Sequence, residues 1–174
     1  GHAEAMWLAL LEAGRPHGVV PYGIEAMGAL RIEKGHVTGA ELDGRTTLDD
    51  LGLAGMASRK KDFIGKALMQ RPALTGSERK QLVGIVSLDG KPARGGAHLV
   101  RGADARSPGR SEGHVTSWTW SPARDANIAL ALLERGRERH GERMFAADPV
   151  RGAHTPVEIT SPVFYDGEGA RQNG

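Results

Sequence analysis

The first part of the chain has the apolar spacing of helices. Five apolar residues recur at i, i+3, i+4, i+7 and i+8, which is the spacing of one helix face: Ala3, Met6, Trp7, Leu10 and Leu11. Gly14 follows as a C-cap candidate, and Pro16 prevents the helix from continuing. The pattern therefore predicts an amphipathic helix over residues 3–13.

A second helix is predicted over residues 23–34, with apolar residues on more than one side. These residues are Ile24, Met27, Leu30 and Ile32. Their distribution indicates a well-buried helix. Arg31 and Glu33 lie within it. Because a buried guanidinium needs a partner, we expect a structural ion pair that ties this helix to a neighbouring element.

Helix-start chemistry appears twice more before residue 76. Over residues 46–52, a threonine would cap the helix, and two aspartates would occupy the first turn, where the helix dipole favours anions. Asp62 is the expected N-cap of a further helix that begins over residues 62–68 and ends at Pro72.

The pattern changes to that of strands near residue 76. Short β-prone runs recur at intervals of roughly 10–15 residues, the spacing of an all-β barrel or sandwich; they cover residues 82–86, 97–100, 114–119, 128–133, 143–146, 157–160 and 162–165. Residues 102–110 read as a loop and 167–174 as a frayed tail. We therefore expect an α+β chain, with a helical part over residues 1–76 and a small antiparallel β barrel over residues 77–174.

Composition excludes several classes of protein. The formal net charge is +2, and the longest basic run is Arg59-Lys60-Lys61, too short for a nucleic-acid footprint. The absence of Cys excludes disulfides, thiolate catalysis and Cys-ligated zinc. No apolar run approaches the roughly 20 residues that span a bilayer, so no membrane segment is predicted. The cytoplasm is the default location.

No catalytic or metal-binding arrangement is visible in the residues themselves. The seven His are scattered without the spacing of metal ligands. Ser117 and Ser121 lie in no nucleophile elbow. Trp118 and Trp120 point to the same face of their strand, where they would form barrel core or an interface patch. Tyr165 would serve either packing or a ligand pocket, because its ring is apolar and its tip polar.

The order of short motifs resembles the aminomethyltransferase, or glycine-cleavage T-protein, superfamily. Residues 23–35 (GIEAMGALRIEKG) resemble its LRIEKG helix, and residues 61–68 (KDFIGKAL) resemble its K-x-D-F-I-G element. Residues 113–117 (GHVTS), followed by Ser121-Pro122, are similar to its G-x-V-T-S…S-P segment. Each motif is weak alone, but their common order across nearly the whole chain identifies it as a member of this superfamily.

Within the superfamily, the sequences of several segments are most similar to those of the α subunits of heterotetrameric sarcosine oxidases. These segments are residues 20–37, 39–44, 148–152 and 162–166. The resemblance implies the C-terminal portion of a folate-binding domain followed by a C-terminal β barrel. It also implies an activity: sarcosine is oxidised on a flavin, and its one-carbon unit passes to tetrahydrofolate. Glycine and hydrogen peroxide are the other products, and formaldehyde is released when folate is absent.

The same resemblance implies that this chain works only as part of a complex. The expected partners are the β, γ and δ subunits and an N-terminal part of the α subunit. NAD, FAD and FMN would belong to parts of that complex outside this chain. Because the chain begins at Gly1 without Met, we expect a fragment or a processed start, and we expect the isolated chain to be inactive.

The resemblance also indicates which residues would contact tetrahydrofolate. In aminomethyltransferases folate is held by an Arg in the LRIEKG helix region and a Tyr near the C-terminus, besides an Asp and a Glu upstream. The Arg position is Met27, whose thioether cannot form the charge-assisted hydrogen bonds of a guanidinium. The Tyr position matches Tyr165. Arg31 and Glu33 match the motif and are interpreted as structural supports of the site.

Two alternatives stay open. In the first, the chain belongs to another folate enzyme, such as an aminomethyltransferase or a dimethylglycine dehydrogenase-like protein. Alternatively, it would be a scaffold that docks partner subunits and keeps only a vestigial folate pocket, a hypothesis that Met27 motivates.

Overall fold

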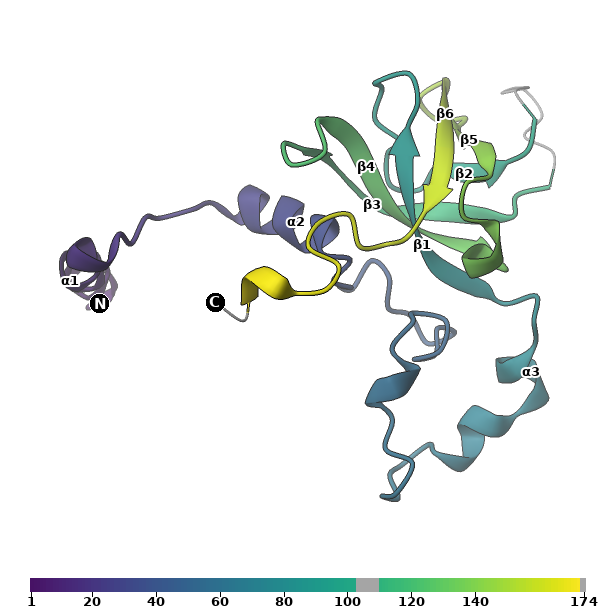
Figure 1. The fold of residues 1–174 in the computed structure, drawn as a ribbon, viewed down its shortest axis with the longest axis horizontal. Coiled ribbons are helices and arrows are strands. Elements are labelled where there is room, and N and C mark those ends of the chain that lie inside the picture. Colours follow the sequence, from purple (N-terminus) through teal and green to yellow (C-terminus); the bar gives the residue numbers. More distant parts are fainter. Residues whose placement is uncertain (103–109, 173–174) are drawn as a thin grey trace.

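A β barrel forms the body of the molecule; the N-terminal helices extend to its left, and the segment that precedes the barrel extends below it (Figure 1). The computed structural model describes residues 1–102 and 110–172. In this part of the chain six strands form the barrel: β1 (Lys80–Ser87), β2 (His98–Val100), β3 (Gly113–Ser121), β4 (Ala126–Glu134), β5 (Arg143–Asp148) and β6 (Ala153–Thr160). The short 3-10 helix η4 (Gly136–Arg139) follows β4. Six of the seven predicted strands are thus confirmed.

The barrel is closed and antiparallel. Neighbouring strands follow the order β1, β4, β3, β2, β5, β6, and β6 pairs with β1 to complete the ring. Closure removes free strand edges, which would otherwise invite pairing with other chains. The predicted α+β class with a C-terminal antiparallel barrel is therefore confirmed.

Strand β4 is buried on both of its faces, which explains its continuous apolar sequence. Its inward residues Ala129, Ala131 and Leu133 belong to the barrel core. Its outward residues Ile128, Leu130 and Leu132 join a second apolar cluster with Ile32, Leu51 and Phe164. This outer cluster attaches the preceding chain and the C-terminal segment to the wall of the barrel.

The two N-terminal helices form as predicted, but their burial differs. Helix α1 (Ala3–Gly14) is followed by η1 (Arg15–His17), has no buried residue, and lies apart from the barrel (Figure 1). Helix α2 (Ile24–Glu33) was expected to be well buried, and this is wrong: Ile24 is 82% exposed and Leu30 58%. Only one face of α2 packs on the barrel, and in the described residues nothing covers the opposite face.

The segment between α2 and the barrel is mostly turns, so both helix predictions there are wrong. Residues 48–52 form consecutive turns, and the turn over residues 64–66 leads into a 3-10 helix. Pro72 begins a short helix instead of ending one. The regular pieces are η2 (Ala54–Met56), η3 (Ala67–Gln70) and α3 (Pro72–Thr75). No continuous apolar face packs on the barrel here, and capping chemistry alone does not sustain a helix.

The last predicted strand, residues 162–165, is also wrong. This segment leaves the barrel and runs beside α2, and the 3-10 helix η5 (Ala170–Gln172) ends the described chain (Figure 1). The backbone N–H groups of Phe164 and Tyr165 donate to the carbonyl of Glu33, at 2.8 and 3.0 Å, and not to a strand. The loop predicted over residues 102–110 lies largely outside the described residues.

The two strand tryptophans lie outside the barrel core. Trp118 is 41% exposed and Trp120 48%, so the core interpretation is wrong. Trp118 pairs with Ala129 of the barrel core, so the two indoles lie on the inward face of β3 but remain partly exposed. Ser117 and Ser121 instead face α2. Among the described helices, none is long and apolar enough to cross a membrane.

Candidate functional site

A groove between α2 and β3 is the main concave feature next to the predicted site residues. It encloses about 580 Å³, and the two elements line it from opposite sides: Glu25, Gly28, Ala29, Arg31 and Ile32 from α2, and Ser117, Trp118, Thr119 and Trp120 from β3. We call this feature the α2–β3 groove. Arg31 offers a positive charge to this groove.

A buried carboxylate, Glu41, fixes Arg31 at the edge of this groove. Glu41 is 1% exposed, and its side chain pairs with the guanidinium of Arg31 at 3.1 Å. Arg31 also donates to the hydroxyl of Ser117 at 2.5 Å and to the carbonyl of His36. The ion pair predicted for Arg31 is therefore present. It ties α2 to a loop and to the barrel.

A β-bulge in β3 brings two neighbouring hydroxyls to the same carboxylate. The strand register shifts between Val115 and Ser117, so Thr116 is the extra residue. Adjacent residues of a regular strand point to opposite faces, and a bulge re-aims one of them. Here the hydroxyls of Thr116 and Ser117 both donate to Glu41 Oε1, at 2.7 and 2.6 Å.

The donors around Glu41 keep it ionised. Burial alone would raise the pKa of Glu41, because it penalises the charged form. Hydrogen bonds from Ser117, Thr116 and the backbone of Thr38, together with the charge of Arg31, outweigh burial and hold the pKa below its usual value. A buried carboxylate whose oxygens are satisfied in this way rigidifies the elements that donate to it.

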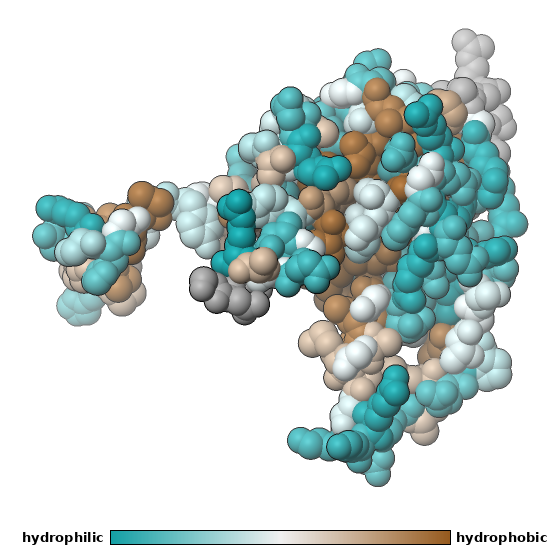
Figure 2. Space-filling model, viewed as in Figure 1, coloured by the Kyte–Doolittle hydropathy of each residue, from teal (hydrophilic) through white to brown (hydrophobic). Residues whose placement is uncertain are grey.

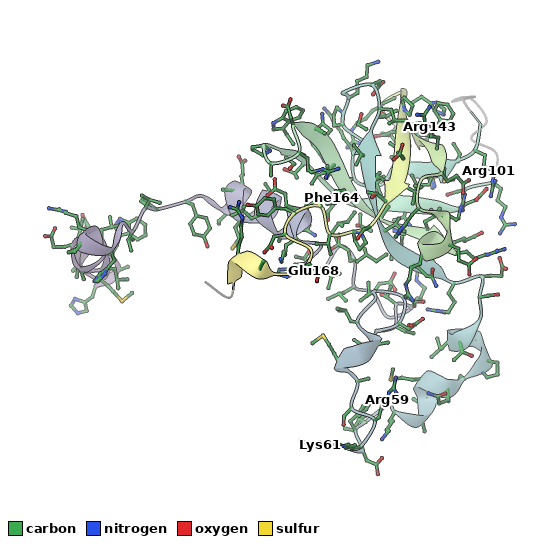
Figure 3. The ribbon with its side chains drawn as sticks, viewed as in Figure 1. Arg59, Lys61, Arg101, Arg143, Phe164 and Glu168 are labelled. Atoms are coloured by element: carbon green, nitrogen blue, oxygen red, sulfur yellow. The ribbon has the colours of Figure 1, made fainter. Side chains whose placement is uncertain are left out.

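The C-terminal end of α2 holds the segment that carries Tyr165. The carbonyl of Glu33 accepts the N–H groups of Phe164 and Tyr165, while its carboxylate accepts the hydroxyl of Ser121. Lys34 donates to the backbone carbonyl of Asp166 at 2.5 Å and pairs with its carboxylate at 3.2 Å. Figure 3 shows Phe164 where this segment meets the barrel.

A second ion pair attaches the loop after α2 to the start of the barrel. Arg79 contacts the buried carboxylate of Asp50 at 2.5 Å. The backbone carbonyl of Asp50 accepts the N–H of Leu82 on β1 at 2.7 Å. Asp50 and Thr47 also exchange hydrogen bonds in the manner of a capping box, although no helix follows.

The predicted folate residues lie around α2 but do not share one cavity. Met27 is 51% exposed and does not line the α2–β3 groove, whose α2 residues are on the other side of the helix. Tyr165 is 37% exposed, and the guanidinium of Arg171 lies 5.4 Å from its ring centroid. In the described residues no hydrogen bond joins Met27 to Tyr165.

Sequence reasoning missed Glu41 and the hydroxyls that bind it. Glu41 lies in an irregular loop, where no periodicity distinguishes a buried carboxylate from a solvated one. The adjacent hydroxyls of residues 116–117 were a usable signal, because polar side chains that a strand buries require partners. Across residues 1–102 and 110–172, no group of His, Asp and Glu is arranged to hold a metal ion.

Comparison with known proteins assigns the fold to a family. The model described as the glycine cleavage T-protein C-terminal barrel domain matches residues 80–166, and the GCVT N-terminal domain model matches residues 1–61. The chain belongs to the glycine cleavage T-protein family. The aminomethyltransferase of the glycine cleavage system from Bartonella henselae has a similar structure, with a TM-score of 0.75 and 26% identity over 93% of this chain and 43% of that one.

Among the family's named members, similarity to sarcosine oxidases is high. The "Sarcosine oxidase subunit alpha" of Rhizobium meliloti is 45% identical over 98% of this chain. The "Aminomethyltransferase" of Streptomyces coelicolor is 32% identical over 94% of it. The chain spans 18% of the first of these relatives and 44% of the second. In this glycine cleavage T-protein family member, the matched regions thus contain α2, the β3 bulge and the segment of Tyr165.

Proposed function

We propose that this chain forms one wall of a tetrahydrofolate site in the α subunit of a cytoplasmic sarcosine oxidase. Nearly the whole length of this chain matches sarcosine oxidase α subunits, which supports sarcosine oxidase as the parent enzyme. The boundary proposed near residue 76 separates the last part of the folate-binding domain from the barrel. The β, γ and δ subunits, and the NAD, FAD and FMN of the complex, lie outside this chain in this proposal.

The observation that carries the proposal is the attachment of Tyr165 to α2. Two backbone hydrogen bonds to Glu33 place the Tyr165 segment beside the same helix that carries Met27. The two positions at which the family contacts folate therefore belong to one unit, which Arg31, Glu33 and Glu41 hold on the barrel. We keep Arg31 and Glu33 as supports of the site and Tyr165 as the contact.

The residues present fit part of a folate molecule. The half-exposed phenol of Tyr165 would donate or accept one hydrogen bond, and the thioether of Met27 would pack against an apolar part of the ligand. Met27 would leave a folate carboxylate without the guanidinium partner of other family members. Bound tetrahydrofolate would supply the acceptor for the one-carbon unit, so that methylenetetrahydrofolate forms in place of free formaldehyde, while glycine forms in both cases.

A binding titration tests the contact at Tyr165. Tetrahydrofolate is titrated into the protein that carries the complete folate domain, with Tyr165→Phe as the variant. Loss of one hydrogen bond is expected to weaken binding about fivefold. Tyr22→Phe is the matched control, because Tyr22 is the other tyrosine and is 69% exposed. Equal affinity of the wild type and Tyr165→Phe would remove Tyr165 from the site.

The same titration separates a working pocket from a vestigial one. Met27→Arg introduces the family's guanidinium, which is expected to tighten binding about tenfold through a charge-assisted contact with folate. Absence of saturable binding in both the wild type and Met27→Arg would favour the alternative, a docking scaffold for partner subunits.

A further inference from the structure

A small hollow at one mouth of the barrel lies outside the site described above. It encloses about 220 Å³ and is formed where the loop after β1, the start of β2, the end of β5 and the start of β6 meet. Its floor is made of buried alanines, Ala93, Ala97 and Ala146, which belong to the barrel core. Barrel mouths are common ligand sites, and this volume is below the roughly 300 Å³ of pockets for drug-sized ligands.

Positive charge gathers at the rim of this hollow. Its lining includes three cationic side chains, Lys91, Arg94 and Arg151, but a single carboxylate, Asp148. Asp148 is 6% exposed and binds Arg151 through the guanidinium at 2.6 Å and through the backbone N–H at 3.1 Å. Arg151 is thereby held in position, and one edge of its guanidinium has no partner within residues 1–102 and 110–172.

Arg94 is the rim cation with the fewest partners. Within the described residues, the guanidinium of Arg94 makes one cation–π contact, with the ring of Trp118, whose centroid lies 5.8 Å from the guanidinium carbon. A cation over an indole face keeps its N–H groups available to a ligand in the plane of the guanidinium. Two guanidiniums with free donors at one opening are suited to a carboxylate, because a guanidinium binds the two carboxylate oxygens in a planar manner and a second one can donate to either oxygen.

We propose that the barrel mouth binds a small monocarboxylate with a short aliphatic chain. Its carboxylate pairs with Arg94 and Arg151, and its alkyl part enters the hollow and packs against Ala153, which is exposed there. Lys91 at the rim is paired with Asp89, at 3.7 Å, so the two arginines carry the recognition of the carboxylate. This site depends on the barrel alone, so it stands or falls independently of the folate proposal.

A titration of the 174-residue chain with butyrate tests the proposal. Binding is measured from the changes in the amide chemical shifts of Ala97 and Ala146. Saturable binding is expected, and butyramide, which has the same shape without charge, is expected not to bind. Arg94→Gln should weaken butyrate about tenfold, since it removes a charge-assisted contact. Arg143→Gln is the matched control: Arg143 is an exposed arginine at the opposite end of β5 (Figure 3).

A second variant tests the alkyl part of the site. Ala153 is exposed and lines the hollow, so Ala153→Leu fills it without disturbing the core and should abolish butyrate binding. Inorganic phosphate should bind more weakly than butyrate, because it has no alkyl part to pack against Ala153. The proposal is overturned by absence of saturable butyrate binding up to roughly 50 mM, by equal effects of Arg94→Gln and Arg143→Gln, or by phosphate binding as tightly as butyrate.

Discussion

At the scale of single residues, Glu41 is the central support of the α2–β3 junction. Its carboxylate accepts hydrogen bonds from an α2 side chain, a loop backbone and two β3 hydroxyls. The sequence predicted that Arg31 needs a partner but not which residue it is. A partner ten positions along an irregular loop cannot be found from helical spacing, because tertiary packing alone brings it to the helix.

Glu41→Gln tests this support. Removing one partner of a buried ion pair is expected to lower the free energy of unfolding by about 3 kcal/mol at pH 7. Glu25→Gln, which removes an exposed charge from α2, should change it little. Denaturant unfolding of the two variants and the wild type measures the difference. Equal stability of all three proteins would show that Glu41 does not hold the junction together.

The stability of Glu41→Gln should also depend less on pH than that of the wild type. Because the pKa of Glu41 is lower in the folded chain than its ordinary value of 4.5, its stabilisation is complete above that pH and is lost as the pH falls through the folded value. The wild type should therefore lose more stability than Glu41→Gln between neutral and acidic pH. Parallel pH profiles of the two proteins would contradict this assignment.

At the scale of elements, the end of α2 determines where the C-terminal segment lies. Gly35 has a φ of +72°, and the N–H groups of Gly35 and His36 donate to Ile32 and Arg31 in a Schellman motif. A Cβ at Gly35 would lie 2.6 Å from the carbonyl oxygen of Pro162. This contact brings the chain that leads to Tyr165 against the helix terminus.

Gly35→Ala should loosen this attachment. The left-handed backbone and the contact with Pro162 are expected to cost more than about 1 kcal/mol of unfolding free energy. Gly28→Ala in the same helix meets no atom within 4 Å and should be neutral or stabilising, since alanine favours helix. Thermal unfolding of both variants gives the comparison, and similar losses in both would argue against the proposed role of Gly35.

The elements that the sequence predicted correctly are those whose own pattern decides their structure. Strands β1 and β4 have long apolar runs, and α1 has a clear helical period. The predictions for residues 62–68 and 162–165 were wrong. The side chains of these segments have the pattern of a helix and of a strand, but contacts with other parts of the chain determine their structure. Backbone bonds to Glu33 decide the second case, and no local pattern encodes them.

At the scale of the whole molecule, large apolar surface remains exposed outside the barrel. At least half of each of these side chains is exposed: Ile24 and Met27 on α2, Met6 and Trp7 on α1, and Ile64 in the segment between α2 and β1. Figure 2 shows apolar surface beside the C-terminal segment where it meets the barrel. Exposed apolar faces of this extent are typical of surfaces that pack on further protein. This agrees with the proposal that the chain acts within a larger complex.

The isolated chain should therefore have no activity of its own. Mixed with sarcosine and oxygen, the 174-residue chain is expected to produce no hydrogen peroxide, because the proposed flavin site lies outside it. A coupled peroxidase assay measures this, with the complete sarcosine oxidase complex as positive control. Sarcosine-dependent peroxide from the chain alone would show that its chemistry is self-contained.

The fate of the one-carbon unit in the complete enzyme tests the central claim most directly. Formaldehyde released per sarcosine oxidised is measured with and without saturating tetrahydrofolate, in the wild type and in Tyr165→Phe. We expect tetrahydrofolate to suppress formaldehyde release in the wild type. Tyr165→Phe should need a higher tetrahydrofolate concentration for the same suppression. Peroxide production should be unchanged in both proteins. Formaldehyde release that does not respond to tetrahydrofolate, or that responds identically in both proteins, would contradict the proposal.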